Sequence, residues 1–382
     1  MPFASALSEH PSASEATGEV SGAVLEAVGE CPDLVMVSVT RSHAGALEDI
    51  VGTIGSVLHP MAVVGAAAVS VVGTGREVEE TPAISLWAGW TGPLAAVRLT
   101  ATRLADGDWH FDGWPSRLGF EPTVLVLVAD PFTFPSGAFL AWLAERRPGL
   151  AVIGGNASGG LGPGGTRLVT EGRVVSDGAA GVLVGGGVDI ETLVSQGCRP
   201  YGDALTVTRS DRNVIYEVAG VPAMECLVDQ ITHHLAPAEV ASVQTDGLFV
   251  GRVVDERAVD PAPSDYLVRS VVGVDRATGA VAVDDHVPLG STIRFHRRDA
   301  GTAHHELSQV LEGRQADAGL VFTCNGRGTR LFDEAHHDAG VLERRVGPVP
   351  LGGLFAGGEF GPVGGHNFLH EFTASIALFR SR

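Results

Sequence analysis

Continuous apolar runs recur along the chain, and each leads through an amphipathic segment to a second apolar run that contains glycine. The paired runs begin at Leu34 and Ala62, at Val124 and Ala151, and at Leu320 and Leu351. Uninterrupted apolar residues are typical of strands that are buried on both faces, and the segments between them are long enough for helices. The similar spacing predicts a β-α-β unit that is repeated within the chain.

Further β-prone runs close each repeat, such as 84–88 and 179–184, and we expect them to pair antiparallel with the parallel strands. A parallel crossover followed by antiparallel strands produces mixed sheets covered by helices. The pattern therefore predicts an α/β fold of the mixed α+β type. In the second repeat, Ser136 is placed to cap a helix over 137–146.

Two stretches differ from the repeats. Residues 1–32 are rich in Ser, Ala, Glu and Gly, which predicts a flexible N-terminal extension with a short helix over 20–28. Residues 204–283 read as a hairpin, a helix over 222–235 and three more strands. We therefore place a domain boundary near 199–203.

The composition excludes several classes of protein. The 382 residues carry a net charge of −19, and without a basic patch the chain is not expected to bind nucleic acid. All 26 basic residues are arginine, so a Walker-type phosphate loop, a Schiff-base enzyme and a protein kinase are excluded. No signal peptide is visible, and the longest apolar run, 61–73, is too short to cross a bilayer. We expect a cytoplasmic protein that has no membrane contact.

Polar residues gather at glycine-rich turns where predicted strands end. The C-terminal part holds Cys324-Asn325-Gly326-Arg327-Gly328 and then Gly357-Gly358-Glu359, and the N-terminal part holds Asn156-Ala157-Ser158. Glycine lets a backbone approach a ligand closely or adopt a positive φ angle. We therefore expect Cys324, Asn325, Arg327, Gly358, Glu359, Asn156 and Ser158 to contact a small ligand.

Each of these assignments has an alternative. Arg327 and Glu359 suit the carboxylate and the ammonium group of one ligand, but they could equally form an ion pair with each other. Asn156 and Ser158 also fit an ordinary turn, because Asn tolerates positive φ. Cys324 could be a small residue at the floor of a pocket or a core residue.

Catalysis by Cys324 is a further alternative. A thiol nucleophile needs a base and an orienting acid, and His366, His370 and Glu359 lie in the same C-terminal region. No known nucleophile signature surrounds the cysteine. The sequence therefore does not require an enzyme.

Metal and nucleotide binding have weaker support. The adjacent histidine pairs 233–234, 304–305 and 336–337 point in different directions on a helix or strand, so no metal site is expected. The glycines of 160–165 resemble a dinucleotide loop but lack a following helix, so no cofactor is expected.

Several of these motifs resemble the FIST family, named for F-box and intracellular signal transduction proteins. The turn at 324–328, the Gly-Gly-Glu-Phe-Gly-Pro turn and the strand His370-Glu371-Phe372-Thr373 are similar to the FIST C domain, as is the helix start at 220–225. Asp130-Pro131 and the turn at 153–160 are similar to the FIST N domain. The resemblance implies a FIST N domain over 33–202 and a FIST C domain over 203–382. In one departure from the family, 64–69 lacks the polar turn that members tend to carry.

The resemblance implies a bacterial sensory protein that binds small ligands such as amino acids or related metabolites. No output domain is recognisable in the sequence, so we expect a separate signalling partner or self-association into a homo-oligomer. The alternatives from other classes are a cysteine-dependent hydrolase or transferase that uses Cys324, and a protein-interaction scaffold.

Overall fold

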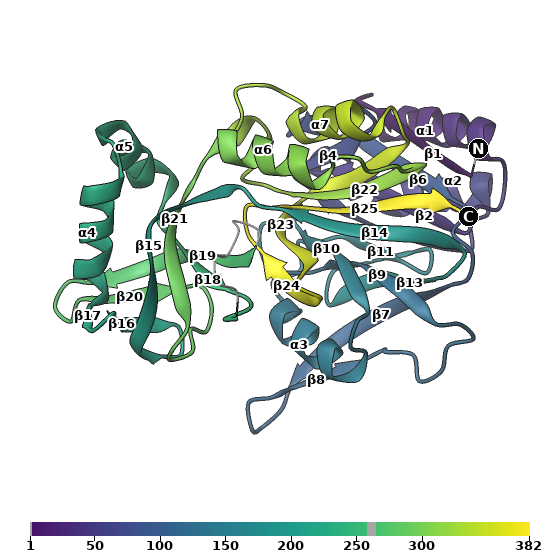
Figure 1. The fold of residues 1–382 in the computed structure, drawn as a ribbon. Helices are drawn as coiled ribbons and strands as arrows, with labels where there is room; N and C mark the ends of the chain where they lie inside the picture. The colour runs from purple at the N-terminus through teal and green to yellow at the C-terminus, as the bar shows by residue number, and fades with distance from the viewer. Residues whose placement is uncertain (1, 258–264) are drawn as a thin grey trace. The chain divides into compact units, whose positions relative to one another are not determined.

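A computed structural model describes residues 2–257 and 265–382 of the chain (Figure 1). The chain folds into two compact units. The first unit comprises Met1–Val194 and Leu307–Arg382, and the second comprises Ser195–Glu306. The second unit begins close to the boundary predicted at 199–203, but the return of residues 307–382 to the first unit was not predicted from the sequence.

The three predicted β-α-β repeats are confirmed in the first unit, each closed by a strand that pairs antiparallel with its first strand. The first repeat consists of β2 (Leu34–Thr40), α2 (Leu47–Leu58), β3 (Ala62–Ala68) and β6 (Ile84–Gly89). The second consists of β9 (Pro122–Ala129), α3 (Ser136–Arg146), β10 (Ala151–Ala157) and β13 (Ala179–Gly185). The third consists of β22 (Ala318–Cys324), α7 (His337–Val346), β23 (Leu351–Val363) and β25 (Ala374–Ser381).

The repeats share one strand order. A further strand pairs with each closing strand: β1 (Phe3–Ser8), β7 (Leu94–Arg103) and β14 (Val188–Ser195). The orders are therefore β1-β6-β2-β3, β7-β13-β9-β10 and β14-β25-β22-β23. The sheets of the second and third repeats are joined where β10 pairs antiparallel with β23, and β8 (Trp109–Asp112) extends the edge at β7. This common order makes the first unit a threefold internal repeat.

The segment between the second strand and the closing strand of each repeat contacts a strand of another repeat. The hairpin β4 (Ser70–Gly73) and β5 (Arg76–Glu79) of the first repeat pairs with β23 of the third. The hairpin β11 (Leu168–Thr170) and β12 (Arg173–Val175) of the second repeat pairs with β3 of the first. From β24 (His366–His370) of the third repeat, Asn367 bonds the backbone of Leu150 and Val152 beside and within β10. Each repeat thus completes another, which ties the three into one body.

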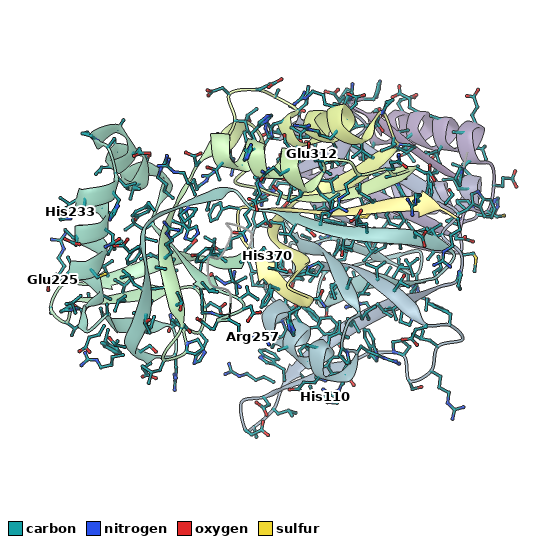
Figure 2. All side chains as sticks on the ribbon, in the orientation of Figure 1. His110, Glu225, His233, Arg257, Glu312 and His370 are labelled. Carbon is teal, nitrogen blue, oxygen red and sulfur yellow. The ribbon has the colours of Figure 1, made fainter. Side chains whose placement is uncertain are left out.

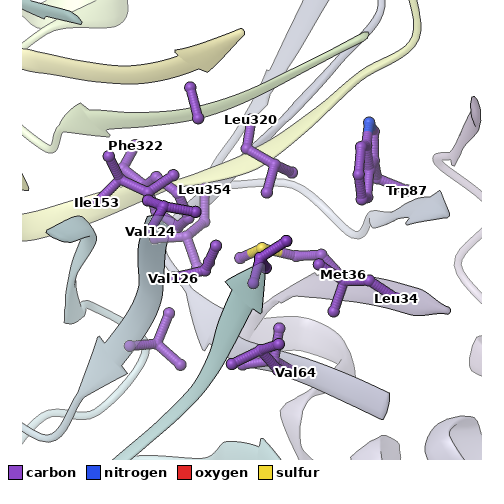
Figure 3. Packing of buried hydrophobic residues seen from close by; sticks show 14 of the residues in the cluster. Leu34, Met36, Val64, Trp87, Val124, Val126, Ile153, Leu320, Phe322 and Leu354 are labelled. Atoms are coloured by element: carbon purple, nitrogen blue, oxygen red, sulfur yellow. The ribbon is translucent and has the colours of Figure 1, made fainter. Parts of the chain in front are cut away.

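Alternation along the strands divides the apolar residues between two layers. Leu34 and Met36 enter a core shared by all three repeats, whereas Val35 and Val37 lie under the helices of their own repeat. Figure 3 shows the shared core, with side chains from every repeat: Leu34, Met36, Val64, Trp87, Val124, Val126, Ile153, Leu320, Phe322 and Leu354. The outer layers hold α1 (Ala13–Val28) and α2, then α3, and finally α6 (Ala300–Val310) and α7.

A glycine occupies the same place in the second strand of every repeat. A β-carbon on Gly65, Gly154 or Gly353 would lie 1.8, 1.8 or 1.9 Å from a carbonyl oxygen of the neighbouring parallel strand. The φ angles of Gly154 and Gly353, +136° and +146°, are also ones that other residues rarely adopt. Close backbone approach therefore requires glycine here, and the glycine-containing strand that marks each repeat in the sequence has a steric cause.

The N-terminal segment differs from the prediction. Residues 1–32 were expected to be a flexible extension, yet β1 pairs along its length with β6, and α1 spans far more than 20–28. Ser12 caps α1 by accepting from the N–H of Glu15. Ala16, Val20 and Val24 repeat at helical spacing and are fully buried against the first repeat. The small residues that suggested flexibility allow this close packing.

The second unit is a closed antiparallel barrel. Its strands are β15 (Cys198–Asp211), β21 (Thr292–Arg298), β18 (Phe249–Val253), β19 (Tyr266–Asp275), β20 (Ala280–Val283) and β16 (Val214–Val218), with β17 (Val221–Pro222) paired to β16. The ring closes because the long β15 pairs with β21 in its first half and with β16 in its second half. Helix α4 (Ala223–His234) contributes to the barrel core, and α5 (Pro237–Asp246) follows it.

Candidate functional site

The C-terminal ends of the parallel strands meet around Ser158, which links all three repeats. Its hydroxyl donates to the carbonyl of Phe355 (2.5 Å) and accepts from the N–H of Val69 (2.9 Å). Arg41, which directly follows β2, donates to the carbonyls of Ser158 and Gly159. Strand ends of this kind are where open α/β sheets bind ligands. We call the group Asn156, Ser158, Cys324, Asn325, Gly357, Gly358, Glu359, Phe372 and Thr373 the strand-end site.

Asn325 carries an unsatisfied polar atom at this site. Its backbone N–H donates to the carbonyl of Ala356 (2.9 Å), which fixes the turn after β22. Its side-chain oxygen is buried and has no hydrogen-bond partner in the described part of the chain. The neighbouring Gly357 is exposed, and a β-carbon there would lie 3.8 Å from the Asn325 amide nitrogen. A buried polar atom without a partner is costly, so it calls for an explanation.

Asn156 faces the same glycines from β10. Its side-chain oxygen accepts from the hydroxyl of Ser136 (2.8 Å), and its amide nitrogen lies 3.3 Å from where a β-carbon of Gly358 would be. Gly358 has a φ angle of +123°, so glycine is required at this position. Ser136 was predicted to cap α3, but Pro135 is the N-cap, and Ser136 orients Asn156 instead.

Glu359 is a fully buried carboxyl. Its Oε2 accepts from the N–H and the hydroxyl of Thr373, at 3.1 and 2.9 Å, and its Oε1 lies 3.3 Å from the N of Gly358. Burial raises the pKa of Glu359 to about 8, although these hydrogen bonds lower it. At neutral pH the raised pKa favours the protonated form of the carboxyl.

The backbone is strained beside this carboxyl. Phe372 has a φ angle of +62°, a conformation that is a real outlier for a bulky residue. Its N–H points at the Cys324 sulfur, and the next residue, Thr373, holds Glu359. Strain of this kind persists where the surrounding structure determines it, often at functional sites.

The environment of Cys324 does not suit a nucleophile. Burial first, and then the charge of Glu359, raise the pKa of the thiol above its usual range, and the N–H groups of Gly326 and Phe372 only partly offset this. The Nε2 of His370 bonds the carbonyl of Gly361, while His366 is exposed on β24. The geometry does not assemble the base and the acid that a cysteine hydrolase needs.

Arg327 takes a position that neither alternative from the sequence described. It is fully buried, and its Nε and Nη2 donate to the two carboxylate oxygens of Asp338 at 2.8 and 2.7 Å. Burial by itself would raise the pKa of Asp338, but the charge and the hydrogen bonds of Arg327 hold it well below its usual range. Thr323 also donates to this carboxylate, and Phe332 lies under the guanidinium. The forked pair fastens the turn after β22 to the start of α7.

Sequence reasoning missed Glu77, another part of this buried cluster. Glu77 lies on β5, its Oε1 accepts from the N–H of Ala339 at 2.9 Å, and its Oε2 has no partner among the described residues. Burial, and then the charge of Asp338, raise its pKa to about 8. The only sequence signal for a role of Glu77 is an acidic residue in a short hairpin, and this signal does not indicate which group the acid contacts.

The other sequence candidates lie elsewhere. His233 of α4 contacts Asp229 one turn earlier, whereas His370 lies on β24 (Figure 2). No group of three metal-ligating side chains is found in residues 2–257 and 265–382. Within the same ranges, no helix is long and apolar enough to span a bilayer.

Comparison with known proteins matches both halves of the chain to family models. The FIST N domain matches residues 33–221, and the FIST C domain matches residues 223–362. Asn156 and Ser158 thus fall in the first match, while Cys324, Asn325 and Glu359 fall in the second. Both matched segments contribute to the strand-end site.

Relatives of similar length occur in mycobacteria. An uncharacterized protein of Mycobacterium tuberculosis (strain H37Rv) is 37% identical over 364 residues, which cover 93% of each chain. An uncharacterized protein of Mycobacterium bovis is 38% identical over 384 residues, covering 97% of this chain and 96% of the relative.

Proposed function

Because the chain belongs to the FIST family, whose domains are sensory domains of signalling proteins, we propose that it senses a small metabolite at the strand-end site. Amino acids or related compounds are the ligand class. Asn325, Gly357, Gly358 and Asn156 contact the ligand, while Arg327, Ser158 and Cys324 hold the turns that present them. Glu359 supplies a buried acid beside the contact.

The observation that carries this proposal is the side-chain amide of Asn325: its oxygen is buried without a partner among the described residues, and its nitrogen lies 3.8 Å from where a β-carbon of the exposed Gly357 would be. Asn325 directly follows Cys324, and beside Cys324 lie the strained Phe372 and Glu359, a carboxyl of raised pKa. Backbone strain and perturbed pKa values cluster at functional sites.

The signal passes to a separate signalling protein or through self-association. We place the protein in the cytoplasm of a bacterium, since all four cysteines are free thiols, as in a reducing compartment, and the relatives are mycobacterial.

A thermal-shift screen against amino acids and common metabolites tests the proposal. A ligand at about a hundred times its dissociation constant stabilises the native state by about 2.7 kcal/mol. We expect a selective shift that is lost in Asn325→Leu. Gln309→Leu makes a similar change at an exposed position of α6 and should leave the shift intact.

Tryptophan fluorescence reports on the unfolding of the first unit alone. All five lie in the first unit, at 87, 90, 109, 114 and 142, so their fluorescence follows the unit that contains the strand-end site. A hit that survives Asn325→Leu would place the ligand elsewhere, and a panel without any hit would remove the support for a metabolite sensor.

A further inference from the structure

The hairpin of β4 and β5 holds the loop that follows β22. Glu77 accepts from the N–H of Ala339 through Oε1 (2.9 Å). Glu79, two residues along the same strand, accepts from the N–H and the hydroxyl of Thr329, at 3.0 and 2.7 Å. The hairpin therefore fastens two points of the segment 325–339, which runs from the strand-end site to α7.

The strand β5 can lose these contacts without disturbing the core. Among the described strands it pairs with β4 alone. In contrast, β4 also pairs with β23, and its Val71 and Val72 are fully buried. A local opening that involves few buried apolar contacts needs less free energy than global unfolding. Separation of β5 from the segment 325–339 is such an opening.

The contact at Ala339 lies in a cluster where acids outnumber fixed cations. Glu77, Asp338 and Arg327 are at most 2% exposed. The single guanidinium forks onto Asp338, at 2.8 and 2.7 Å, and the Oε2 of Glu77 has no partner in the described part of the chain. An ionised oxygen that is buried without a partner is costly. Glu77 therefore fits this position as a neutral acid.

The other titratable groups around the cluster do not change this charge balance. His337 contacts Asp338 through Nδ1 (2.9 Å), a bond that a neutral imidazole can make by donating its N–H. The Nδ1 of His336 accepts from the backbone N–H of Glu77 (3.1 Å), so this nitrogen carries no proton. Glu79 adds a further negative charge. In agreement, burial first and then the charge of Asp338 raise the pKa of Glu77 to about 8.

We propose that Glu77 makes a proton-dependent contact: with its proton it keeps β5 on the segment 325–339, and losing that proton to alkaline solvent separates the two. The closed form holds one proton more than the open form, so the opening equilibrium rises with pH. Opening also loosens the turn that carries Asn325, and it therefore weakens ligand binding at the strand-end site. This last step rests on the proposed function, whereas the contact itself does not.

Hydrogen–deuterium exchange of the full chain without ligand tests the contact. Peptides from 74–80 and 325–339 are compared with peptides from 136–146 of α3 between pH 6 and pH 8, after correction for the pH dependence of intrinsic exchange. We expect the opening equilibrium constant of the first two segments to rise about tenfold or more over this range, and that of α3 to rise less.

Three variants identify the group that carries the proton. Glu77→Gln keeps an acceptor for the N–H of Ala339 but cannot ionise, so the pH dependence of both segments should disappear. Glu80→Gln is the matched control, because Glu80 is exposed beside the same strand and should leave the wild-type profile unchanged. His337→Asn removes the imidazole and should also keep that profile. Circular dichroism shows whether each variant has folded.

Each outcome decides one part of the inference. If the two segments of the wild type do not open with pH, or if Glu77→Gln keeps the dependence, the contact is overturned and the sensor function is untouched, since no ligand is present. Loss of the dependence in His337→Asn would assign the proton to the imidazole and overturn the role of Glu77. If the segments open as expected but a ligand from the thermal-shift screen binds equally at pH 6 and pH 8, only the link to the strand-end site is overturned.

Discussion

Glu359→Gln is expected to change how the stability of the first unit depends on pH. The carboxyl is fully buried and accepts two hydrogen bonds from Thr373 through one oxygen. Glutamine has nearly the same shape, and its carbonyl can accept both bonds. It loses only the long contact with the N–H of Gly358, at a cost of about 1 kcal/mol or less.

The magnitude follows from the shifted pKa. The native carboxyl titrates near pH 8, whereas in the unfolded chain it titrates near its ordinary value of 4.5. Between these values the native state holds one more proton, so the free energy of unfolding falls as the pH rises, by about 1.4 kcal/mol per pH unit. The stabilisation from the protonated native carboxyl is fully present below pH 4.5 and is lost once the pH rises above about 8. Glutamine cannot ionise, so Glu359→Gln lacks this slope and gains about 4 kcal/mol relative to the wild type from pH 5 to 8.

Urea denaturation at several pH values, followed by tryptophan fluorescence, measures this difference in the first unit. Comparing each variant with the wild type at the same pH cancels every other titrating group. Glu145→Gln is the control, because Glu145 is exposed on α3, and its curve should run parallel to the wild type. If Glu359→Gln also runs parallel, the native carboxyl is ionised at neutral pH, and the argument from burial fails.

Three further predictions concern the scaffold and the thiol. Gly353→Ala should prevent folding of the first unit, because the added β-carbon would lie 1.9 Å from a carbonyl oxygen. The control Gly52→Ala places its β-carbon in open space on α2, so it should leave the free energy of unfolding unchanged or raise it by up to about 1 kcal/mol. Circular dichroism and urea denaturation of the two variants test this difference. Arg327→Ala should lower the free energy of unfolding by about 3–5 kcal/mol, because it leaves the buried carboxylate of Asp338 without its counter-charge. A decrease below about 1 kcal/mol in urea denaturation would show that water reaches the ion pair. Native protein at pH 7 should react with a thiol reagent at the exposed Cys31 and not at Cys324, as mass spectrometry of the labelled peptides would show; rapid labelling of Cys324 would revive the hydrolase alternative.

Much of the first unit could be read from the sequence. The β-α-β repeats were predictable because strands buried on both faces leave continuous apolar runs, and because a close backbone approach leaves glycine in each second strand. The turn at 324–328 was also recognisable as polar groups at a strand end. Glu359, expected at a turn where a strand ends, instead lies within β23, where it pairs with Gly155 and His370. These signals are local, so each survives in a short stretch of sequence.

The partners of those residues could not be read in the same way. Arg327 pairs with an aspartate eleven residues later, and nothing in the chain distinguishes Asp338 from Asp333, Glu334 or Glu343 as that partner. Likewise, the N-terminal segment looked flexible because its small residues are compatible both with a mobile tail and with a tightly packed helix. Only the surface available for packing decides between them.

The sequence by itself determined the strands and helices of the three repeats, the glycine in the second strand of each, and that the chain has acids and arginines but no lysine at its turns. The tertiary structure decided which of these groups are satisfied. The exchange of hairpins among three repeats brings together strand ends that are far apart in the chain. It pairs the guanidinium of Arg327 internally and leaves the Asn325 oxygen without a partner among the residues that the structure describes. Hydrogen-bond satisfaction is a property of three-dimensional neighbours, and so the chemistry of the strand-end site emerged only with the fold.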